Sequence, residues 1–309
     1  MSTILAIHAH PDDIETLCAG TLALLAADGH QIRIATATAG EAGSSTMSPS
    51  ETSAIRIAEA TASASVIGAE YRCIGLPDLG VFNDDTGRRA VTETIRWAVP
   101  DVVITASPAD YHPDHEAISL LVRDACFAAS VPNYRTGTSK PLATIPHLYF
   151  MDPIEGRDRE GSRVQPHFGV EVTRGFTAKR AMLVAHKSQD AWVSRQHGIS
   201  DHIASMERWT ARRGRHLGVP LAEGFRQYRH HPYPETPSLQ ELVGTALVRV
   251  PSRSFGNGDI ASGFLTLLPA TAKSDVTRVQ QIALPPWCSA GRRWCRFEWT
   301  LRERSLSKG

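Results

Sequence analysis

Short apolar runs alternate with stretches of helical periodicity along the first 150 residues. Runs rich in β-branched side chains predict buried strands at residues 3–7, 31–38, 70–74 and 101–105. Apolar positions at helical spacing predict helices at residues 16–28, 51–67, 86–98 and 113–129. Strands separated by helices of this length indicate βαβ units, so we expect an α/β fold built on a parallel sheet.

The pattern becomes less regular beyond residue 130. A loop is predicted at residues 131–146, strands at 147–151 and 168–172, and helices at 177–190 and 200–215. The segment from residue 250 onward contains nine Lys and Arg residues but only four Asp and Glu residues. It also contains three Trp residues. This tail carries no metal-binding or catalytic spacing, so we expect the chemistry to lie upstream of it.

Composition narrows the class of protein. The 309 residues are 42% hydrophobic and 21% charged, as in an ordinary globular chain of one large or two modest domains. A net charge of +1 argues against binding to nucleic acid or to an anionic membrane through bulk charge. We expect no transmembrane span, because no run approaches 18 apolar residues, and no signal peptide, because the first residues carry no basic charge.

The cysteines indicate a reducing environment. Five are present, an odd number, and none forms a CxxC pair: Cys18, Cys73, Cys126, Cys288 and Cys295. This pattern predicts free thiols and a cytoplasmic location.

Ionisable residues crowd the end of the first predicted strand in the segment AHPDDIE, residues 9–15. A turn whose Asp caps the next helix would explain one acid. His10 and two adjacent acids exceed what a cap needs. Because adjacent carboxylates on a non-helical turn point in different directions, one of Asp12 and Asp13 can bind a metal while the other stays free to move protons.

A second cluster, DYHPDHE at residues 110–116, follows the fourth predicted strand. A helix that starts at Pro113 would explain the proline and the acids, which suit a helix N-terminus. It would not explain His112 and His115, whose protonated forms are unfavourable at that end of a helix. Neutral, metal-bound imidazoles have no such conflict.

Together the two clusters predict a metal site with one open position. Ligands at the carboxyl ends of parallel strands meet at one edge of the sheet. His10, Asp13 and His115 supply two imidazoles and one carboxylate, a set typical of catalytic zinc, which acts as a Lewis acid on water. The spacing therefore favours a zinc hydrolase.

At this point a family resemblance emerges. AHPDDIE, CAGT, TAGEAGS, IRIAEATASASVIG, LPD and SPADYHPDHEA, in this order, resemble the PIG-L/LmbE-like family of zinc-dependent N-acetylglucosaminyl deacetylases. The resemblance runs from about residue 4 to about residue 228 and includes AHKSQ at 185–189 and AEGFR at 222–226. It implies a Rossmann-like three-layer α/β fold, with an LmbE-like deacetylase domain at residues 1–248. Residues 249–309 form an extension outside the pattern, expected to be irregular or β-rich.

The resemblance also implies roles for single residues. Zinc, or another divalent metal, would be held by His10, Asp13 and His115. Asp12 would be the general base, and His112 would stabilise the oxyanion or protonate the leaving group, with Asp114 orienting it. The residues implied to contact substrate are Arg56 and Asp78. Some members carry a Tyr two residues before the first His of HPDH, where this chain has Asp110, with Tyr111 next to it.

Several functions remain open at this stage. The favoured one is removal of an N-acetyl group from an N-acetylglucosamine-type sugar or its conjugate. The alternatives are an amide hydrolase acting on a thiol-sugar conjugate and a non-catalytic sugar-binding protein. A nucleotide-dependent oxidoreductase would need a G-x-G-x-x-G fingerprint, which does not follow the first strand. We expect a small acetylated amino sugar as the partner, no nucleic acid and no membrane, and leave self-association open.

Overall fold

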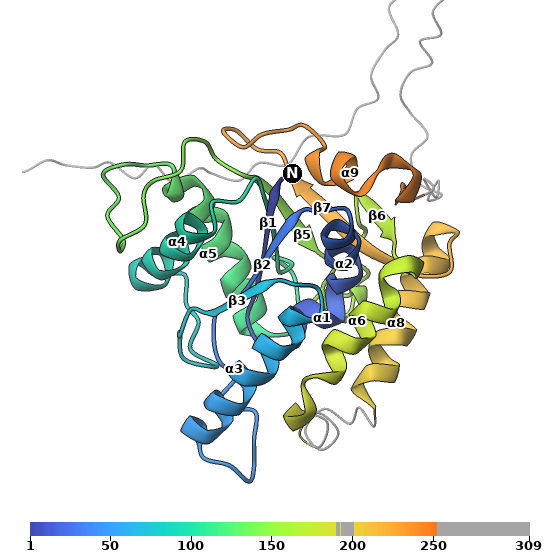
Figure 1. Ribbon diagram of the computed structural model, residues 1–309, viewed down its shortest axis with the longest axis horizontal. Helices are drawn as coiled ribbons and strands as arrows, with labels where there is room; N and C mark the ends of the chain where they lie inside the picture. The colour runs from blue at the N-terminus through green and yellow to red at the C-terminus, as the bar shows by residue number, and fades with distance from the viewer. Residues whose placement is uncertain (190–191, 193–200, 252–309) are drawn as a thin grey trace, which may run out of the picture. The chain divides into compact units, whose positions relative to one another are not determined.

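The computed structural model describes residues 1–189, 192 and 201–251 (Figure 1). The described residues contain an eight-stranded sheet with strand order β3-β2-β1-β4-β5-β7-β6-β8. The strands are β1 (Thr3–His8), β2 (Gln31–Thr36), β3 (Glu70–Cys73), β4 (Val102–Thr105), β5 (His147–Met151), β6 (Phe168–Glu171), β7 (Ala222–Tyr228) and β8 (Val248–Arg249). The first five in this order are parallel and the last three pair antiparallel, which confirms the predicted mostly parallel α/β sheet.

Helices cover both faces of the sheet and make the predicted three layers (Figure 1). They are α1 (Asp13–Leu17), α2 (Ala19–Ala27), α3 (Pro49–Ser65), α4 (Asp85–Ala98), α5 (Pro113–Ala129), α6 (Phe176–Val184), α8 (His202–Leu217) and α9 (Ser238–Val243). Successive side chains of β1 point to opposite faces of the sheet, as strand geometry requires. Ile4 and Ala6 belong to the core that includes α2, whereas Leu5 and Ile7 belong to the core under α4 and α5.

The order of the strands places the two clusters together. From β1 the chain moves outward through β2 and β3, and then returns to β4 on the other side of β1. The strand order therefore reverses between β1 and β4, where α/β sheets bind their ligands. Ile7 pairs with Thr105 near the ends of these two strands. The segments that follow them consequently open into the same crevice.

One predicted helix is in fact two. Residues 16–28 were expected to form a single helix, but the helix begins at Asp13 and breaks at Cys18, whose φ of −141° and ψ of 5° are not helical. The break exposes the first amides of α2. Glu223 accepts hydrogen bonds from Gly20 N at 2.9 Å and Thr21 N at 2.7 Å. A carboxylate more than 200 residues away thus stabilises this start, as helix N-termini favour anions.

Other differences lie in the second half. The helix predicted at 177–190 ends at Val184, because the chain turns to place Ser188 on Glu59, with its hydroxyl 2.6 Å from that carboxylate. Strands β7 and β8 were not expected. In β7 the polar side chains of Glu223 and Gln227 are buried, so hydrophobic alternation does not reveal the strand.

The remaining expectations concern the membrane and the tail. Across the part of the chain that the structure describes, no helix is both long and apolar enough to cross a membrane. The predicted domain boundary at 248 stays a prediction, and almost all of the predicted extension lies outside the described residues. The cysteines among the described residues, Cys18, Cys73 and Cys126, are free thiols.

Candidate metal and catalytic site

Three predicted ligands converge where β1 and β4 end. His10 comes from the loop after β1, Asp13 from the start of α1, and His115 from the first turn of α5. His10 Nδ1 and His115 Nε2 each lie 3.3 Å from Asp13 Oδ2 and 3.3 Å from one another. The three donor atoms therefore form an equilateral triangle. All three residues are buried, so the triangle is built into the fold.

The size of this triangle fits zinc. A tetrahedron whose corners lie about 2.0 Å from its centre, the usual Zn–N and Zn–O distance, has edges of about 3.3 Å. The three donor atoms show this spacing. Two imidazoles and a carboxylate also match the ligand chemistry of catalytic zinc. This group of residues is thus able to bind a metal ion.

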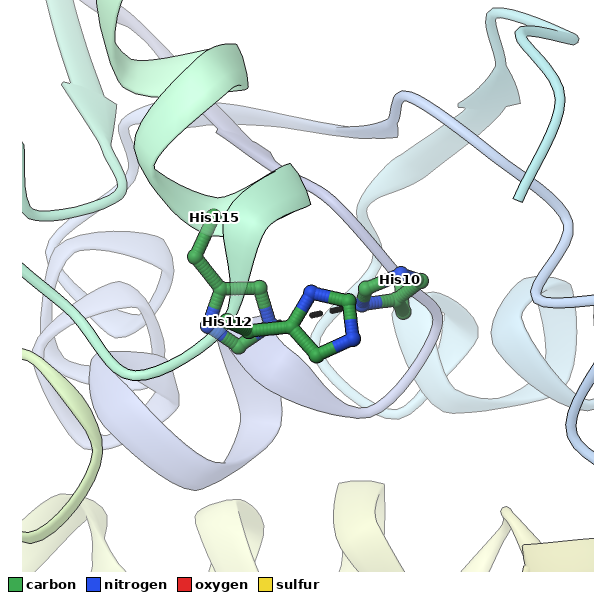
Figure 2. A group of neighbouring side chains, drawn as sticks. All are labelled: His10, His112 and His115. Carbon is green, nitrogen blue, oxygen red and sulfur yellow. Dashed lines mark hydrogen bonds between the residues drawn. The ribbon is translucent and has the colours of Figure 1, made fainter. Parts of the chain in front are cut away.

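Two more histidines enlarge the set of donors. His112 also lies within 4.8 Å of the donor atoms of His10 and His115, and Figure 2 shows the three rings side by side. His8, at the end of β1, forms a further group with Asp13 and His115. Its Nδ1 lies 2.6 Å from Asp13 Oδ2, so it holds the carboxylate in place. The sequence analysis did not select His8, although its position at the carboxyl end of β1 was a usable signal.

Carboxylates fix the orientation of His10. Its Nε2 lies 3.0 Å from Asp78 Oδ1 and 3.4 Å from Asp114 Oδ2. A proton on Nε2 leaves the Nδ1 lone pair free for a metal, the arrangement in which carboxylates usually support ligating histidines. Asp114 was expected to orient His112 and Asp78 to contact substrate. The structure places both carboxylates on His10. In addition, the backbone N–H of Asp114 donates to His112 Nδ1, and Asp78 lines the cavity at the site, so both expectations stay predictions.

The Asp110 carboxylate orients His115 in the same way as carboxylates orient His10. The Asp110 carboxylate is fully buried and lies 3.1 Å from His115 Nδ1, which leaves Nε2 facing the triangle. Burial opposes a charge on His115, but the Asp13 and Asp110 carboxylates raise its pKa to about 9. A metal must therefore displace a proton here. The Asp110 carboxylate thus supports a predicted metal ligand in this chain.

Replacing Asp110 tests this support. We expect Asp110→Ala to lower zinc affinity by about 10- to 100-fold, the usual cost of losing a carboxylate behind a ligating histidine. Competition with a chromophoric chelator measures the affinity. Asp28→Ala, which removes an exposed acid at the end of α2, is the matched control and should leave affinity unchanged. Equal affinities in both variants would contradict the assigned role of Asp110.

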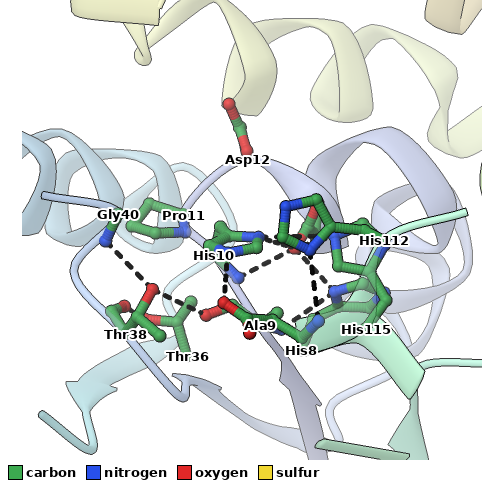
Figure 3. A network of polar contacts seen from close by, with 12 residues as sticks. His8, Ala9, His10, Pro11, Asp12, Thr36, Thr38, Gly40, His112 and His115 are labelled. Carbon is green, nitrogen blue, oxygen red and sulfur yellow. Dashed lines mark hydrogen bonds and ion pairs between the residues drawn. The ribbon is translucent and has the colours of Figure 1, made fainter. Parts of the chain in front are cut away.

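The two adjacent acids diverge because of an unusual backbone conformation. Asp12 has a φ of 96°, a left-handed conformation that non-glycine residues seldom adopt. Asp13 joins the triangle. The Asp12 carboxylate, by contrast, lies apart from the imidazole rings (Figure 3). Burial raises the pKa of Asp12, which brings it closer to the range in which a carboxylate works as a base at neutral pH.

Arg56 fixes the loop that carries Asp12. Its guanidinium donates to Pro11 O at 2.6 Å and to Gly40 O at 2.9 Å, and lies 3.5 Å from the Asp12 carboxylate. Arg56 was expected to contact substrate. It does line the cavity at the site, and two backbone carbonyls of the protein already accept hydrogen bonds from its two terminal nitrogens.

Gly40 shows how tightly Arg56 is packed. Its φ is +66°, and a Cβ there would lie 2.0 Å from Arg56 Nη1. We expect Gly40→Ala to destabilise the protein by more than the roughly 1–2 kcal/mol that the positive φ alone costs, and to lower kcat/KM at least tenfold by displacing Arg56. Gly68→Ala is the matched control, because Gly68 has a φ of +68° with no atom near its Cβ position. Urea unfolding and kinetics of both variants measure the two effects, and identical losses would refute the role of the Arg56 contact.

His112 sits at the N-cap of α5. Its Nδ1 accepts a hydrogen bond from Asp114 N at 3.2 Å, so the ring proton is placed on Nε2. Burial and the nearby His115 and His10 lower the pKa of His112 to about 4. At neutral pH His112 is therefore an uncharged donor, suited to stabilising a developing oxyanion.

These residues line a cavity of about 680 Å³, which we call the catalytic cavity. Its walls include Asp12, Asp13, His115, Tyr111 and Trp209. The volume is in the range of small-molecule sites. The position of Asp12, His112 and the triangle in one wall allows a proton acceptor, an oxyanion donor and a metal to act on one ligand.

Comparison with known proteins places the chain in a family. Residues 5–126 match the family model PIG-L, described as GlcNAc-PI de-N-acetylase. A 1D-myo-inositol 2-acetamido-2-deoxy-alpha-D-glucopyranoside deacetylase from Rhodococcus erythropolis is 32% identical over an alignment of 238 positions, gaps included, that covers 60% of this chain and 80% of that protein. The chain belongs to the PIG-L family. This membership confirms the resemblance and the predicted enzyme class, a deacetylase that hydrolyses an amide bond.

Solved structures show the same fold. An N,N'-diacetylchitobiose deacetylase from Pyrococcus horikoshii aligns with a TM-score of 0.62 at 22% identity, over 76% of this chain and 88% of that one. A 4-carboxy-2-hydroxymuconate hydratase from Pseudomonas putida also aligns with a TM-score of 0.62, at 21% identity, over 76% of this chain and 100% of that one. These alignments show a shared fold, and a fold does not specify a substrate, so substrate and mechanism have to be argued from the site.

Proposed function

We propose that this PIG-L family chain is a zinc-dependent hydrolase that removes the acetyl group from an N-acetylglucosamine-type sugar or its conjugate. The observation that carries the proposal is the triangle of His10, Asp13 and His115, with Asp12 and His112 in the same cavity. The deacetylase from Rhodococcus erythropolis supports the substrate class.

The protein groups divide the reaction between them. When bound, zinc would polarise the amide carbonyl and make water more acidic. Asp12 takes the proton of the attacking water, whose oxygen bonds to the acetyl carbon. His112 Nε2–H donates to the developing oxyanion, a contribution worth about 3–4 kcal/mol in comparable sites. Asp12 then returns its proton to the nitrogen as the C–N bond breaks, which releases acetate and the amine.

The remaining predicted residues hold these groups in place. In this proposal Asp78 and Asp114 orient His10, and Arg56 fixes the loop of Asp12. Arg56 and Asp78 also line the catalytic cavity, so both can contact a sugar hydroxyl at its edge. Their main effect on the rate would then come through positioning.

A substrate panel tests the proposal against its alternatives. The zinc-loaded protein is tested with three classes of compound. They are N-acetylglucosamine glycosides, a thiol-sugar conjugate that contains an amide bond but no acetyl group, and an unsaturated hydroxy acid as a hydratase substrate. We expect free amine and acetate from the first class. Cleavage of the thiol conjugate alone would favour the related amidase, and loss of the unsaturated acid would favour hydration. Sugar binding without turnover would indicate a binding protein.

We further propose that residues 1–248 carry the deacetylase domain, with β8 continuing the sheet to Arg249. All residues placed in the site precede this point. A chain ending at Pro251 should therefore keep its zinc and deacetylate a small N-acetyl amino sugar as fast as the full chain. Zinc content and kcat/KM of the two chains measure this, and loss of zinc from the shorter one would show that the extension supports the site.

A further inference from the structure

A second cavity of about 300 Å³ adjoins the catalytic cavity. The two share Thr16, Glu155, Arg157 and Trp209 in their walls. The second cavity lies between α8 and the segment that follows β5, and its lining includes Arg163. We call it the arginine-lined cavity. Arg157 belongs to both linings, so it lies at the border between the two cavities.

The charges of the two cavities differ in sign. Acids outnumber arginines among the residues that line the catalytic cavity. In the arginine-lined cavity the balance is reversed. Its basic residues are Arg157, Arg163, Lys179, Arg212, Arg213 and Arg215, and its acids are Asp152, Glu155 and Glu223.

Ion pairs within the protein neutralise two of those three acids. Lys179 Nζ lies 2.5 Å from Glu223 Oε1, and Arg213 Nε lies 2.5 Å from Asp152 Oδ2. Four arginines then face a single remaining acid, Glu155. Partial desolvation lowers the pKa of Arg212, which is otherwise exposed; Glu155 raises that pKa, and the charges of Arg157, Arg213 and Arg163 lower it. The guanidinium groups of two separate chain segments are thus brought together against their mutual repulsion.

We propose that the arginine-lined cavity binds an anionic group, phosphate or carboxylate, on the part of the substrate beyond the amino sugar. Guanidinium forks match the oxygen geometry of both groups. The acetamide would lie at the triangle and the anion among Arg157, Arg163 and Arg212. This inference rests on the proposed deacetylase function and adds the chemical class of the conjugate.

Three matched glycosides test it: the methyl glycoside of N-acetylglucosamine, its carboxymethyl counterpart and N-acetylglucosamine 1-phosphate. We expect kcat/KM to be at least tenfold higher for one or both charged compounds than for the methyl glycoside. That preference should shrink with added salt, because screening weakens charge pairs. Equal kcat/KM for all three would overturn the proposal, and the ratio of the two charged compounds tells carboxylate from phosphate.

The double variant Arg163→Gln/Arg212→Gln should abolish the preference and leave the methyl glycoside unaffected. Both side chains are exposed, so their loss should not unfold the protein. Arg180→Gln is the matched control, since Arg180 on α6 pairs with Glu207 at 3.0 Å and does not line either cavity. A preference that survives in the double variant would overturn the proposal.

Binding separates this inference from the proposed function. Calorimetry of the Asp12→Asn protein with the same glycosides requires no turnover. We expect the charged compounds to bind at least tenfold more tightly, and the double substitution to remove that difference. If no glycoside is deacetylated but this difference is found, the proposed function fails and the anion site stands. Equal binding of charged and methyl compounds overturns the anion site, whatever the activity.

Discussion

Asp12→Asn should lower kcat by about 100-fold or more while the protein keeps its zinc. Loss of a general base typically costs this much, about 2.7 kcal/mol of barrier. Asn preserves the shape of the side chain and tolerates the positive φ at this position, so the loop after β1 should not change. Because burial raises the pKa of Asp12, removing its charge should also leave thermal stability equal or higher.

Elemental analysis, steady-state kinetics and thermal unfolding of the variant check these three results. The control is Asp13→Asn, which should lose zinc, because Asp13 Oδ2 is one corner of the triangle. If Asp12→Asn lost zinc as readily as Asp13→Asn, the assigned division of labour between the two acids would be wrong.

His115→Ala should lower zinc affinity, whereas His112→Ala should lower kcat. His115 Nε2 is part of the 3.3 Å triangle, so its loss should lower zinc affinity by at least tenfold. His112 Nδ1 already accepts from Asp114 N, and we assign its Nε2–H to the oxyanion. His112→Ala should therefore keep zinc and lose about 100- to 1,000-fold in kcat.

Zinc titration and kinetics of the two variants decide between two donor sets. His10, His112 and His115 together form a second group of nearby donors, and a three-histidine site would lose metal with either substitution. Equal zinc loss in both variants would thus show that His112, and not Asp13, is the third ligand.

The local sequence was sufficient to predict the features that depend on hydrophobic periodicity and on where strands end. The strand that ends at His8, the helix Pro113–Ala129 and the meeting of His10 with His115 all follow from apolar patterns and the rule for parallel sheets. The ligand triangle needed only that both clusters follow adjacent strands.

Contacts between distant segments were not predictable from one sequence. The helix break at Cys18 is stabilised by Glu223, and β7, which carries that residue, has buried polar side chains that hide its strand pattern. The same limitation applies to Asp78 and Asp114. Their sequence positions suggested contacts with substrate and His112, which stay predictions, and gave no sign that the fold also brings both carboxylates to His10 Nε2.

The arginine-lined cavity is a further example. Arg157 and Arg163 lie about 50 residues before Arg212 in the sequence, and β6 and α6 stand between them. Nothing in the spacing of these arginines indicates that they meet. Their convergence depends on α8 packing beside the segment that follows β5, which a single sequence does not specify.

The central claim is that a metal held by His10, Asp13 and His115 supports hydrolysis of an N-acetyl amide. The most direct measurement is a titration of metal-stripped protein with zinc, in which acetate released from an N-acetylglucosamine glycoside is counted against bound metal. The account predicts no acetate without metal, a rise in proportion to bound zinc up to one ion per chain, and one free amine for each acetate. Acetate release that is undiminished in the stripped protein, or a saturated metal site with no acetate, would contradict it.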